Sequence, residues 1–356
     1  MKIVHISETL VSGVQAYLRN LSTFLSTHAP HAQVYIIYSG QREEFDKAVA
    51  EQLFMGKATL IEVPMANSIS PLKDLASTVK IYREIQKIKP DVIHLHSSKA
   101  GILGRMASIF YRKKKKLFYT PHGYAFLRQD VGNTSRRVFR LIEKYAQFFL
   151  GGTTIACGDT EYEIAKGFGR AALMRNGLLF DSQTPVEAQP NNHKLTVGIV
   201  SRLTYARSPM LFNKIALRFP DIQFVWIGDG ELRHELTAPN IAVTGWLFNH
   251  NEVMKHLAGL DIYMQTSLWE GLPFAVLEAM TLQKPVIATN VIGNKDIVVH
   301  GKTGFLFADI AELDAFFEVL KDKQVRLEMG REGFKRCKEV FDTNENFKGL
   351  LELYLQ

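Results

Sequence analysis

Short apolar runs that alternate with amphipathic stretches constrain the fold of this chain most strongly. In the first half, the runs that fit buried strands cover residues 2–7, 34–39, 91–96, 116–120 and 153–157. Stretches with helical periodicity lie between them, at 14–26, 72–88 and 136–149. Strands that are apolar throughout and alternate with helices are typical of a parallel sheet that is covered on both faces.

The pattern starts again after a polar, proline-bearing stretch at 176–193. The second series of predicted strands covers residues 195–201, 222–228, 241–245, 261–266 and 285–290. A chain of 356 residues is long for one core, so we predict two Rossmann-like, doubly wound α/β domains that face an interdomain cleft. The predicted parts are an N-terminal domain over 1–178, a linker over 179–193, a C-terminal domain over 194–338, and a last helix over 339–356 that packs back toward the N-terminal domain.

The composition, 46% hydrophobic and 22% charged, is that of a soluble globular protein. No apolar run approaches the roughly 20 residues of a membrane-spanning helix. The first residues form a predicted strand and lack the features of a signal peptide. Cys157 and Cys337 are too few for a disulfide framework. We therefore expect a cytoplasmic protein.

Charge is distributed unevenly along the chain. Residues 1–180 hold 25 Lys and Arg against 14 Asp and Glu, whereas the remainder holds 18 against 22. Two basic groups stand out in the first half, Arg112–Lys116 and the set Arg136, Arg137 and Arg140. They predict contact with an anionic surface, such as the inner face of the plasma membrane, and a solvated basic face is the alternative.

The segment EGLPFAVLEAM at 270–280 places two carboxylates eight positions apart. Glu270 falls in the loop after a predicted strand, Pro273 suits the first turn of a helix, and Glu278 lies inside that helix. On a continuous helix the two would be about 12 Å apart, so they would hold different parts of one ligand. A diphosphate could lie at the helix N-terminus between them. An ordinary helix with capping acids is the alternative.

Arg202 and Arg207 follow the predicted strand at 195–201. Two guanidinium groups at such a place would neutralise a diphosphate. Pairs of surface arginines are common, so this signal is weak alone.

The ordered motifs VSRLTYAR, WIGDGE, VTGW, SLWEGLPFAVLEAM, KPVIAT and GKTGFLF resemble the C-terminal domain of the retaining GT-B glycosyltransferases of family 4, also called glycosyl transferases group 1. In the first half, SG at 12–13, DVIHLHSSKAG at 91–101, YTPHG at 119–123 and RNG at 175–177 agree with this family. The resemblance covers essentially the whole chain. It is closest to bacterial enzymes that build capsule, exopolysaccharide or lipid-linked glycans.

For the second half, the resemblance implies that Glu278 accepts from the ribose hydroxyls of a nucleotide and Glu270 from a hydroxyl of the donor sugar. Arg202 and Arg207 would bind the diphosphate, although the family more often has Lys-Gly where this chain has Arg207-Ser208. The remaining implied contacts are the helix start at Gly271, Leu272, Pro273 and Phe274, and the backbone near Trp246 and Leu247, which would meet the base.

For the first half, the resemblance implies that Gly13 allows close approach to the phosphates and that His122 helps position the reacting sugar or the acceptor. A His after a strand can also be an ordinary polar residue of the fold. Lys99 could meet a phosphate of the acceptor. His94 is expected in the core, and His96 either there or in the cleft.

The family resemblance implies an enzyme that transfers a sugar with retention, by front-face attack, and without a metal or other cofactor. The expected donor is a UDP-sugar, and the expected acceptor is a saccharide or a lipid-diphosphate-linked glycan. Alternatives are an epimerase or hydrolase of the same shape, and a basic nucleic-acid-binding protein, for which no known reader motif is present. A dehydrogenase is excluded because no predicted strand is followed by G-x-G-x-x-G.

Overall fold

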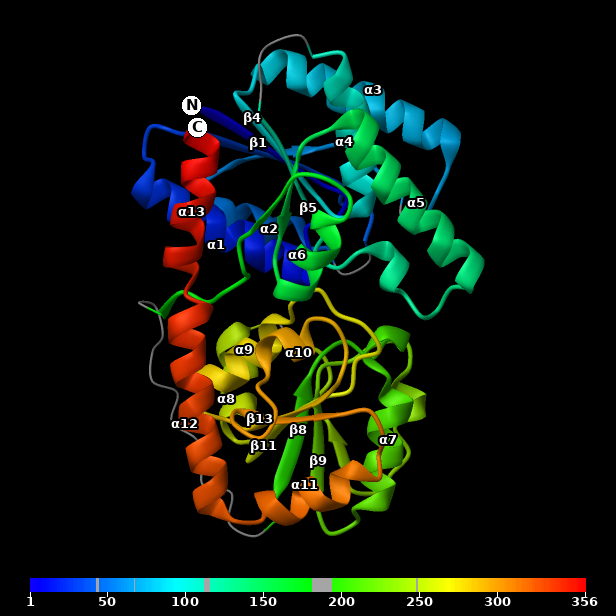
Figure 1. The fold of residues 1–356 in the computed structure, drawn as a ribbon, viewed down its shortest axis with the longest axis vertical. Coiled ribbons are helices and arrows are strands. Elements are labelled where there is room, and N and C mark those ends of the chain that lie inside the picture. The colour runs from blue at the N-terminus through cyan, green and yellow to red at the C-terminus, as the bar shows by residue number, and fades with distance from the viewer. Residues whose placement is uncertain (43–44, 67, 112–115, 181–193, 248) are drawn as a thin grey trace. The chain divides into compact units, whose positions relative to one another are not determined.

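The structure is a computed structural model that describes residues 1–42, 45–66, 68–111, 116–180, 194–247 and 249–356 (Figure 1). The described residues form two compact units. Unit 1 comprises Met1–Leu127, Gly132–Asn176 and Thr343–Gln356, and unit 2 comprises Arg128–Val131 and Gly177–Asp342. Most of the predicted linker lies outside the described residues, as do residues 112–115 of the first basic group.

A seven-stranded sheet forms the centre of unit 1, with the strand order β3-β2-β1-β4-β5-β6-β7 and parallel pairing between neighbours. The strands are β1 (Lys2–Ser7), β2 (Gln33–Tyr38), β3 (Thr59–Glu62), β4 (Val92–His96), β5 (Lys116–Thr120), β6 (Thr153–Ala156) and β7 (Ala171–Leu173). All five strands that the sequence predicts here are present. The two others, β3 and β7, are short strands at the sheet edges, where the apolar pattern is weak.

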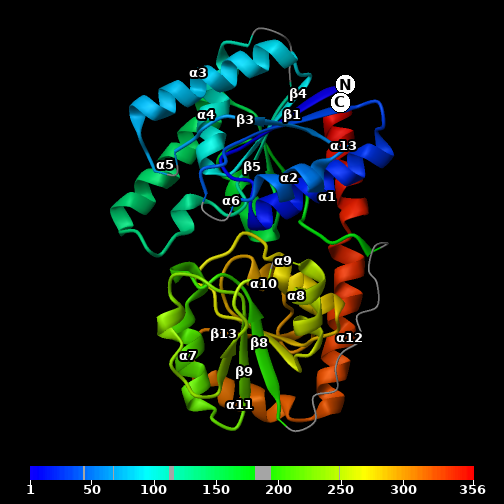
Figure 2. The ribbon, with the colours of Figure 1, turned by 180° about the vertical axis from the view of Figure 1, so that it is seen from behind.

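Helices cover both faces of this sheet. They are α1 (Ser12–His28), α2 (Lys47–Phe54), α3 (Pro71–Ile88), α4 (Ser98–Ile109), η1 (Ala125–Leu127), α5 (Asn133–Leu150), α6 (Asp159–Lys166) and α13 (Thr343–Leu355). α4 contacts both α3 and α5, while α1 contacts α2 and α13 (Figures 1 and 2). Val4 and Ile6 of β1 belong to the apolar cluster that includes α3 and α4 residues. Because side chains alternate along a strand, His5 points to the opposite face, where its ring lies near Tyr354 of α13.

Unit 2 has a six-stranded parallel sheet in the order β10-β9-β8-β11-β12-β13. Its strands are β8 (Thr196–Val200), β9 (Gln223–Ile227), β10 (Ile241–Val243), β11 (Ile262–Gln265), β12 (Val286–Thr289) and β13 (Gly304–Phe307). Its helices are η3 (Tyr205–Arg207), α7 (Pro209–Arg218), η4 (Arg233–Glu235), α8 (His250–Ala258), α9 (Phe274–Thr281), α10 (Asn294–Ile297), α11 (Glu312–Leu320) and α12 (Lys323–Val340). The prediction of two Rossmann-like α/β folds is confirmed.

Each sheet has a point where the strand order reverses, between β1 and β4 in unit 1 and between β8 and β11 in unit 2. In open parallel sheets, ligands bind beyond the carboxyl ends of the strands at such a point. The loops that follow these strands are therefore the expected places for a bound ligand. None of the helices in the described residues is both long enough and apolar enough to cross a membrane.

Candidate functional site

Two loops meet at the carboxyl edge of the unit 2 sheet, one after β8 and one after β11. Thr266 Oγ1 donates to the carbonyl of Arg207 at 2.7 Å. The N–H of Leu268 donates to the carbonyl of Ala206 at 2.8 Å. These bonds fix η3, which carries Arg207, against the loop that carries Glu270.

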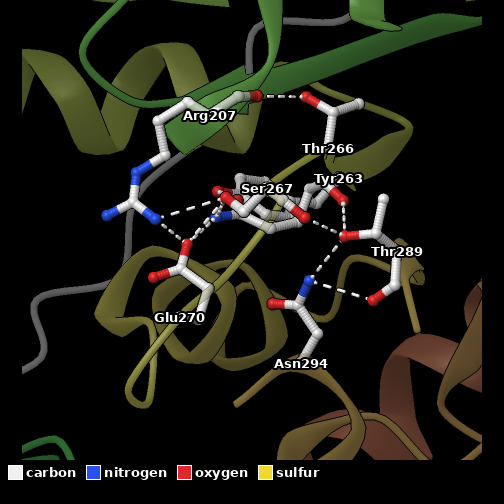
Figure 3. A network of polar contacts seen from close by, with 8 residues as sticks. Arg207, Tyr263, Thr266, Ser267, Glu270, Thr289 and Asn294 are labelled. Carbon is white, nitrogen blue, oxygen red and sulfur yellow. Dashed lines mark hydrogen bonds and ion pairs between the residues drawn. The ribbon is translucent and has the colours of Figure 1, made fainter. Parts of the chain in front are cut away.

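Glu270 lies at the centre of a polar network in these loops (Figure 3). Its side chain is almost completely buried, with a residue exposure of 6%. Gln265 Nε2 and Ser267 Oγ each donate to Glu270 Oε1 at 2.7 Å. Arg207 Nη1 donates to the same oxygen and forms an ion pair with it. The described residues thus bond Glu270 at Oε1, and its other carboxylate oxygen can accept from a ligand.

A second layer of polar side chains supports this network (Figure 3). Tyr263 OH donates to Gln265 Oε1 at 2.7 Å, and Thr289 Oγ1 donates to the carbonyl of Ser267 at 2.6 Å. Asn294 Nδ2 donates to Thr289 Oγ1 at 3.1 Å. Burial raises the pKa of Tyr263, so its hydroxyl remains a hydrogen-bond donor. These side chains fix the orientation of the groups that hold Glu270.

Gly293 allows the loop after β12 to pass close to Glu270. It has a positive φ of 87°, and a Cβ at this position would lie 2.5 Å from the carbonyl oxygen of Gly271 and 2.8 Å from Glu270 Cβ. Neither the backbone conformation nor the space suits another residue. Gly293 therefore allows the loop after β12 to pack directly against Gly271 and Glu270.

In the helix that follows Glu270, Pro273 lies just before the first turn, in which the sequence analysis places it. Pro273 is the N-cap of α9 and Phe274 its first residue, while Leu272 is buried. No acidic residue lies in the first turn, and no side chain caps it. The N–H groups at this end and the positive end of the helix dipole suit an anion.

Glu278 lies on α9 and is partly exposed. Its Oε1 is 3.9 Å from Nε2 of His250, the first residue of α8. Its surroundings thus differ from those of Glu270. Glu278 is the member of the pair whose side chain a ligand can reach more easily.

The other residues predicted for unit 2 surround the same sheet edge at different depths. Arg202 follows β8 and is partly exposed, whereas Trp246, after β10, is exposed. Leu247 is partly buried beside it. A flat, exposed aromatic ring near the end of a strand can stack on a nucleobase.

In unit 1, His122 lies in the loop after β5 and has a positive φ of 55°. The carboxylate of Glu161, in the first turn of α6, accepts from the N–H of Gly123 at 2.9 Å. The same side chain accepts from the N–H of Cys157 at 2.8 Å. Glu161 therefore holds the loop in the conformation that places His122. Sequence reasoning did not identify this glutamate.

A chain of hydrogen-bonded histidines leads from the interior of unit 1 to His122. His5 Nδ1 and His96 Nε2 are 2.9 Å apart, and His96 Nδ1 and His122 Nε2 are 3.1 Å apart. His94 bonds Tyr354 of α13 and, at 2.8 Å, Thr120 Oγ1. His94 lies in the core as predicted. His96 is fully buried, and both of its ring nitrogens bond other histidines, so it supports His122 from within.

Burial keeps these imidazoles neutral. It lowers the pKa of His5 and of His122 from 6.5 to about 3. Burial together with neighbouring histidines lowers the pKa of His94 and His96 well below 6.5. A neutral histidine donates from one ring nitrogen and accepts at the other. The hydrogen bonds from His5 through His96 to His122 can therefore all be donated in the same direction.

Ring nitrogens of His5, His94 and His96 lie within 4.8 Å of one another, close enough to be considered as metal ligands. Five of their six ring nitrogens already have hydrogen-bond partners, and His5 Nε2 is the exception. A metal would have to replace several of these bonds. Metal independence stays a prediction.

The two remaining predicted residues of unit 1 differ in their surroundings. Gly13 is exposed in the first turn of α1, where the backbone is open to a ligand. Lys99, in contrast, forms an ion pair with Asp74 at 2.6 Å and donates to the carbonyl of Ser68 at 2.8 Å. Its ammonium group therefore links α4 to the start of α3.

Other charged groups at this sheet edge were not identified from the sequence. Glu8 follows β1, is buried, and forms an ion pair with Arg42 at 2.9 Å. Burial raises the pKa of Glu8, although Arg42 acts in the opposite direction. The sequence signal for Glu8 was a carboxylate that directly follows a predicted buried strand.

Comparison with protein families identifies the chain. The family described as glycosyl transferases group 1 matches residues 194–322, and the one described as glycosyltransferase family 4 matches residues 11–175. The two matches cover more than four fifths of the sequence. The chain belongs to the family 4 (group 1) glycosyltransferases. This glycosyltransferase is therefore an enzyme, and the family predicted from its motifs is confirmed.

Curated relatives of the glycosyltransferase include two bacterial enzymes. One is the UDP-Gal:alpha-D-GlcNAc-diphosphoundecaprenol alpha-1,3-galactosyltransferase of Escherichia coli, 28% identical over 288 residues that cover 72% of each chain. Another is the capsular polysaccharide biosynthesis glycosyltransferase CapM of Staphylococcus aureus, 26% identical over 82% of this chain and 83% of CapM.

Solved structures share the GT-B fold of this glycosyltransferase. Sucrose-phosphate synthase from Thermosynechococcus elongatus matches with a TM-score of 0.82 and 16% identity, over 100% of this chain and 98% of that one. Anabaena HepE in complex with UDP and glucose matches with a TM-score of 0.77 and 19% identity, over 99% and 98%. At these identities the likeness establishes the fold alone.

Proposed function

We propose that the glycosyltransferase moves a sugar, with retention of configuration, from UDP-sugar to a saccharide or lipid-diphosphate-linked acceptor in the synthesis of a cell-surface polysaccharide. The observation that carries this proposal is the convergence of Arg207, Glu270 and the N-terminus of α9 at the switch point of unit 2. These groups offer a guanidinium, a carboxylate and a helix dipole to a ligand that carries both phosphate and hydroxyl groups.

Each group in unit 2 has a distinct task in this proposal. The free oxygen of Glu270 accepts from a hydroxyl of the donor sugar, while Glu278 accepts from the ribose. Arg202, Arg207 and the α9 N-terminus, at Gly271–Phe274, bind the diphosphate. Trp246 and Leu247 lie against the base. A UDP-sugar is favoured because the E. coli relative is named for UDP-Gal and HepE was crystallised with UDP-glucose.

The reaction breaks the bond between the anomeric carbon and the diphosphate oxygen, and forms a bond to the acceptor oxygen on the same face of the sugar. The acceptor hydroxyl gives its proton to the departing diphosphate oxygen. Arg202 and Arg207 stabilise the charge that develops on the leaving group, without a metal. Gly13 and His122, both in unit 1, have in this proposal the roles that the family resemblance implies. His122, which stays neutral, positions a reacting hydroxyl rather than supplying a charge.

Transfer from a panel of UDP-, GDP- and ADP-sugars to undecaprenyl-diphosphate-linked saccharides tests the proposal. We expect turnover with a UDP-sugar, and a product whose anomeric configuration by NMR matches the donor. Glu270→Ala and Glu278→Ala should each reduce kcat/KM by about 10- to 100-fold, the effect of losing a charged hydrogen bond. Glu328→Ala, an exposed change on α12, is the matched control.

Several outcomes would contradict the proposal. Stabilisation of the protein by no nucleotide would exclude a nucleotide-sugar transferase. Epimerised or hydrolysed donor without any transfer product would favour an epimerase or hydrolase. Unchanged affinity of Glu278→Ala for UDP would remove the ribose assignment.

A further inference from the structure

Helix α5 exposes an apolar stripe to solvent. The exposed large side chains recur at intervals of three and four residues, which places them on one side of the helix. They are Val138, Leu141, Ile142, Tyr145, Phe148 and Phe149. Phe148 and Phe149 are 74% and 72% exposed, so these two rings are almost entirely outside the fold. An apolar stripe of this kind normally faces the core.

The buried side of the same helix carries two polar side chains, Glu143 and Gln147. Glu143 Oε1 accepts from Ser98 Oγ at 2.6 Å and from Tyr119 OH at 2.9 Å. Gln147 Oε1 accepts from Arg105 Nη2 at 2.8 Å. These bonds satisfy polar groups that would be costly to bury unpaired, and they fix which side of α5 faces the sheet. The outward direction of the apolar stripe is therefore built into the fold.

The neighbouring helix α4 also exposes large apolar side chains at its C-terminal end. Met106 and Ile109 of α4, and Phe110 directly after it, are exposed large apolar side chains. α4 contacts α5 within unit 1, and both views show the two helices side by side (Figures 1 and 2). We call the α5 stripe and these three residues the apolar face. Contiguous exposed apolar surface on a soluble protein marks a site of protein or membrane contact.

The exposed charges that α5 itself carries have one sign. Arg137, Arg140 and Lys144 are exposed on α5. The sole acid of this helix is Glu143, which is buried and already bonded. A partner that covers the apolar face would thus meet basic groups and no exposed carboxylate of α5. A partner that has an apolar interior and a negatively charged boundary would match both the apolar side chains and the basic residues of α5.

We propose that the apolar face docks on an anionic lipid bilayer, with α5 lying in the headgroup region. Phe148, Phe149 and Tyr145 enter the boundary between headgroups and acyl chains, and the basic residues bind lipid phosphates. A second copy of the chain on the same face would bring its own arginines and lysine against these, which disfavours it. The reason for docking rests on the proposed lipid-linked acceptor, although the binding itself does not require activity.

Co-sedimentation of the full chain with vesicles tests the docking. We expect binding to vesicles of phosphatidylcholine with about one third phosphatidylglycerol, weaker binding to pure phosphatidylcholine, and a decrease at high salt. Phe148→Ser/Phe149→Ser and Arg137→Gln/Lys144→Gln should each raise the lipid concentration for half-binding by about 10-fold or more.

Matched controls come from unit 2. Leu217→Ser/Val319→Ser removes two exposed apolar side chains there, and Lys335→Gln/Lys338→Gln removes two exposed charges. Both should bind vesicles like the wild type. Circular dichroism and transfer to a water-soluble saccharide acceptor should be unchanged in the α5 variants, which separates loss of docking from loss of folding.

The proposal is overturned if the wild type does not bind anionic vesicles, or if the α5 variants bind as well as the controls. A concentration-dependent dimer that Phe148→Ser/Phe149→Ser abolishes would instead make the face an interface between copies. Absence of sugar transfer by a wild type that still binds vesicles would refute the proposed function and leave the docking intact.

Discussion

The two units present opposite kinds of chemistry at equivalent places. At its switch point unit 2 brings together full charges, with Arg207 paired to the nearly buried Glu270. Unit 1 brings together neutral imidazoles, His5, His96 and His122, in one hydrogen-bonded chain. Charges suit the binding of a diphosphate, whereas neutral donors and acceptors suit the placement of hydroxyl groups. One fold can therefore serve two tasks through the side chains at its strand ends.

The largest expected effect tests the role of the charged groups at the switch point of unit 2. Arg207→Ala should lower kcat/KM by about 1000-fold, because it removes a charge from the diphosphate and also leaves Glu270 buried without its counter-ion. Arg207→Lys should recover part of the loss, since it restores the charge without the planar fork. Steady-state kinetics with the UDP-sugar donor measure both.

Arg331→Ala, an exposed change on α12, serves as the control for the loss of an arginine. If the kcat/KM of Arg207→Ala stayed within about threefold of the wild-type value, the charge of Arg207 at the switch point of unit 2 would have no role in transfer.

A smaller expected effect tests the role of the neutral histidines of unit 1. His122→Asn should lower kcat by about 10- to 100-fold while the affinity for UDP stays unchanged. Asn tolerates the positive φ of this position, so the loop itself should persist. Kinetics together with thermal shifts in UDP separate the two quantities. A loss of UDP affinity equal to the loss of kcat would assign His122 to donor binding instead.

The last prediction concerns how the free energy of unfolding depends on pH. The four histidines bind a proton near pH 6.5 when unfolded, but their folded pKa values are lower. The unfolded state therefore binds more protons below 6.5, and stability falls as the pH drops from 6.5 toward 3. Each histidine contributes at most about 1.4 kcal/mol per pH unit. Thermal unfolding between pH 7.5 and 5 measures the slope.

Hydrogen exchange can assign this acid sensitivity to one unit. Amides of β1 and β4 should lose protection on acidification before those of β8 and β11. His5→Asn should reduce the slope by up to about 1.4 kcal/mol per pH unit. Equal loss of protection in both sheets would show that the histidine chain does not make unit 1 distinct.

Much of the fold and part of the site could be predicted because the signals are local. Alternation of apolar runs with helical stretches indicated both sheets, and the spacing of Glu270 and Glu278 placed one in a loop and the other on a helix. The motifs around them were sufficient to indicate the family. The short edge strands β3, β7 and β13 were missed, because three or four residues carry little periodic pattern.

The partners of the predicted residues could not be found in this way. Arg207 and Glu270 are 63 residues apart in the chain, and His5 and His96 are 91 apart. Both contacts exist because neighbouring strands of a parallel sheet end at the same edge. Glu161 and Gly293 support the sites from other elements, which no local pattern connects to them.

Helix α5 separates most clearly what the sequence determined from what the tertiary structure decided. The sequence by itself determined an amphipathic, basic helix, because its apolar residues recur at intervals of three and four. It did not determine which side would be buried. The tertiary structure decided that Glu143 and Gln147 face inward, because Ser98, Tyr119 and Arg105 provide the hydrogen bonds that those side chains need once buried.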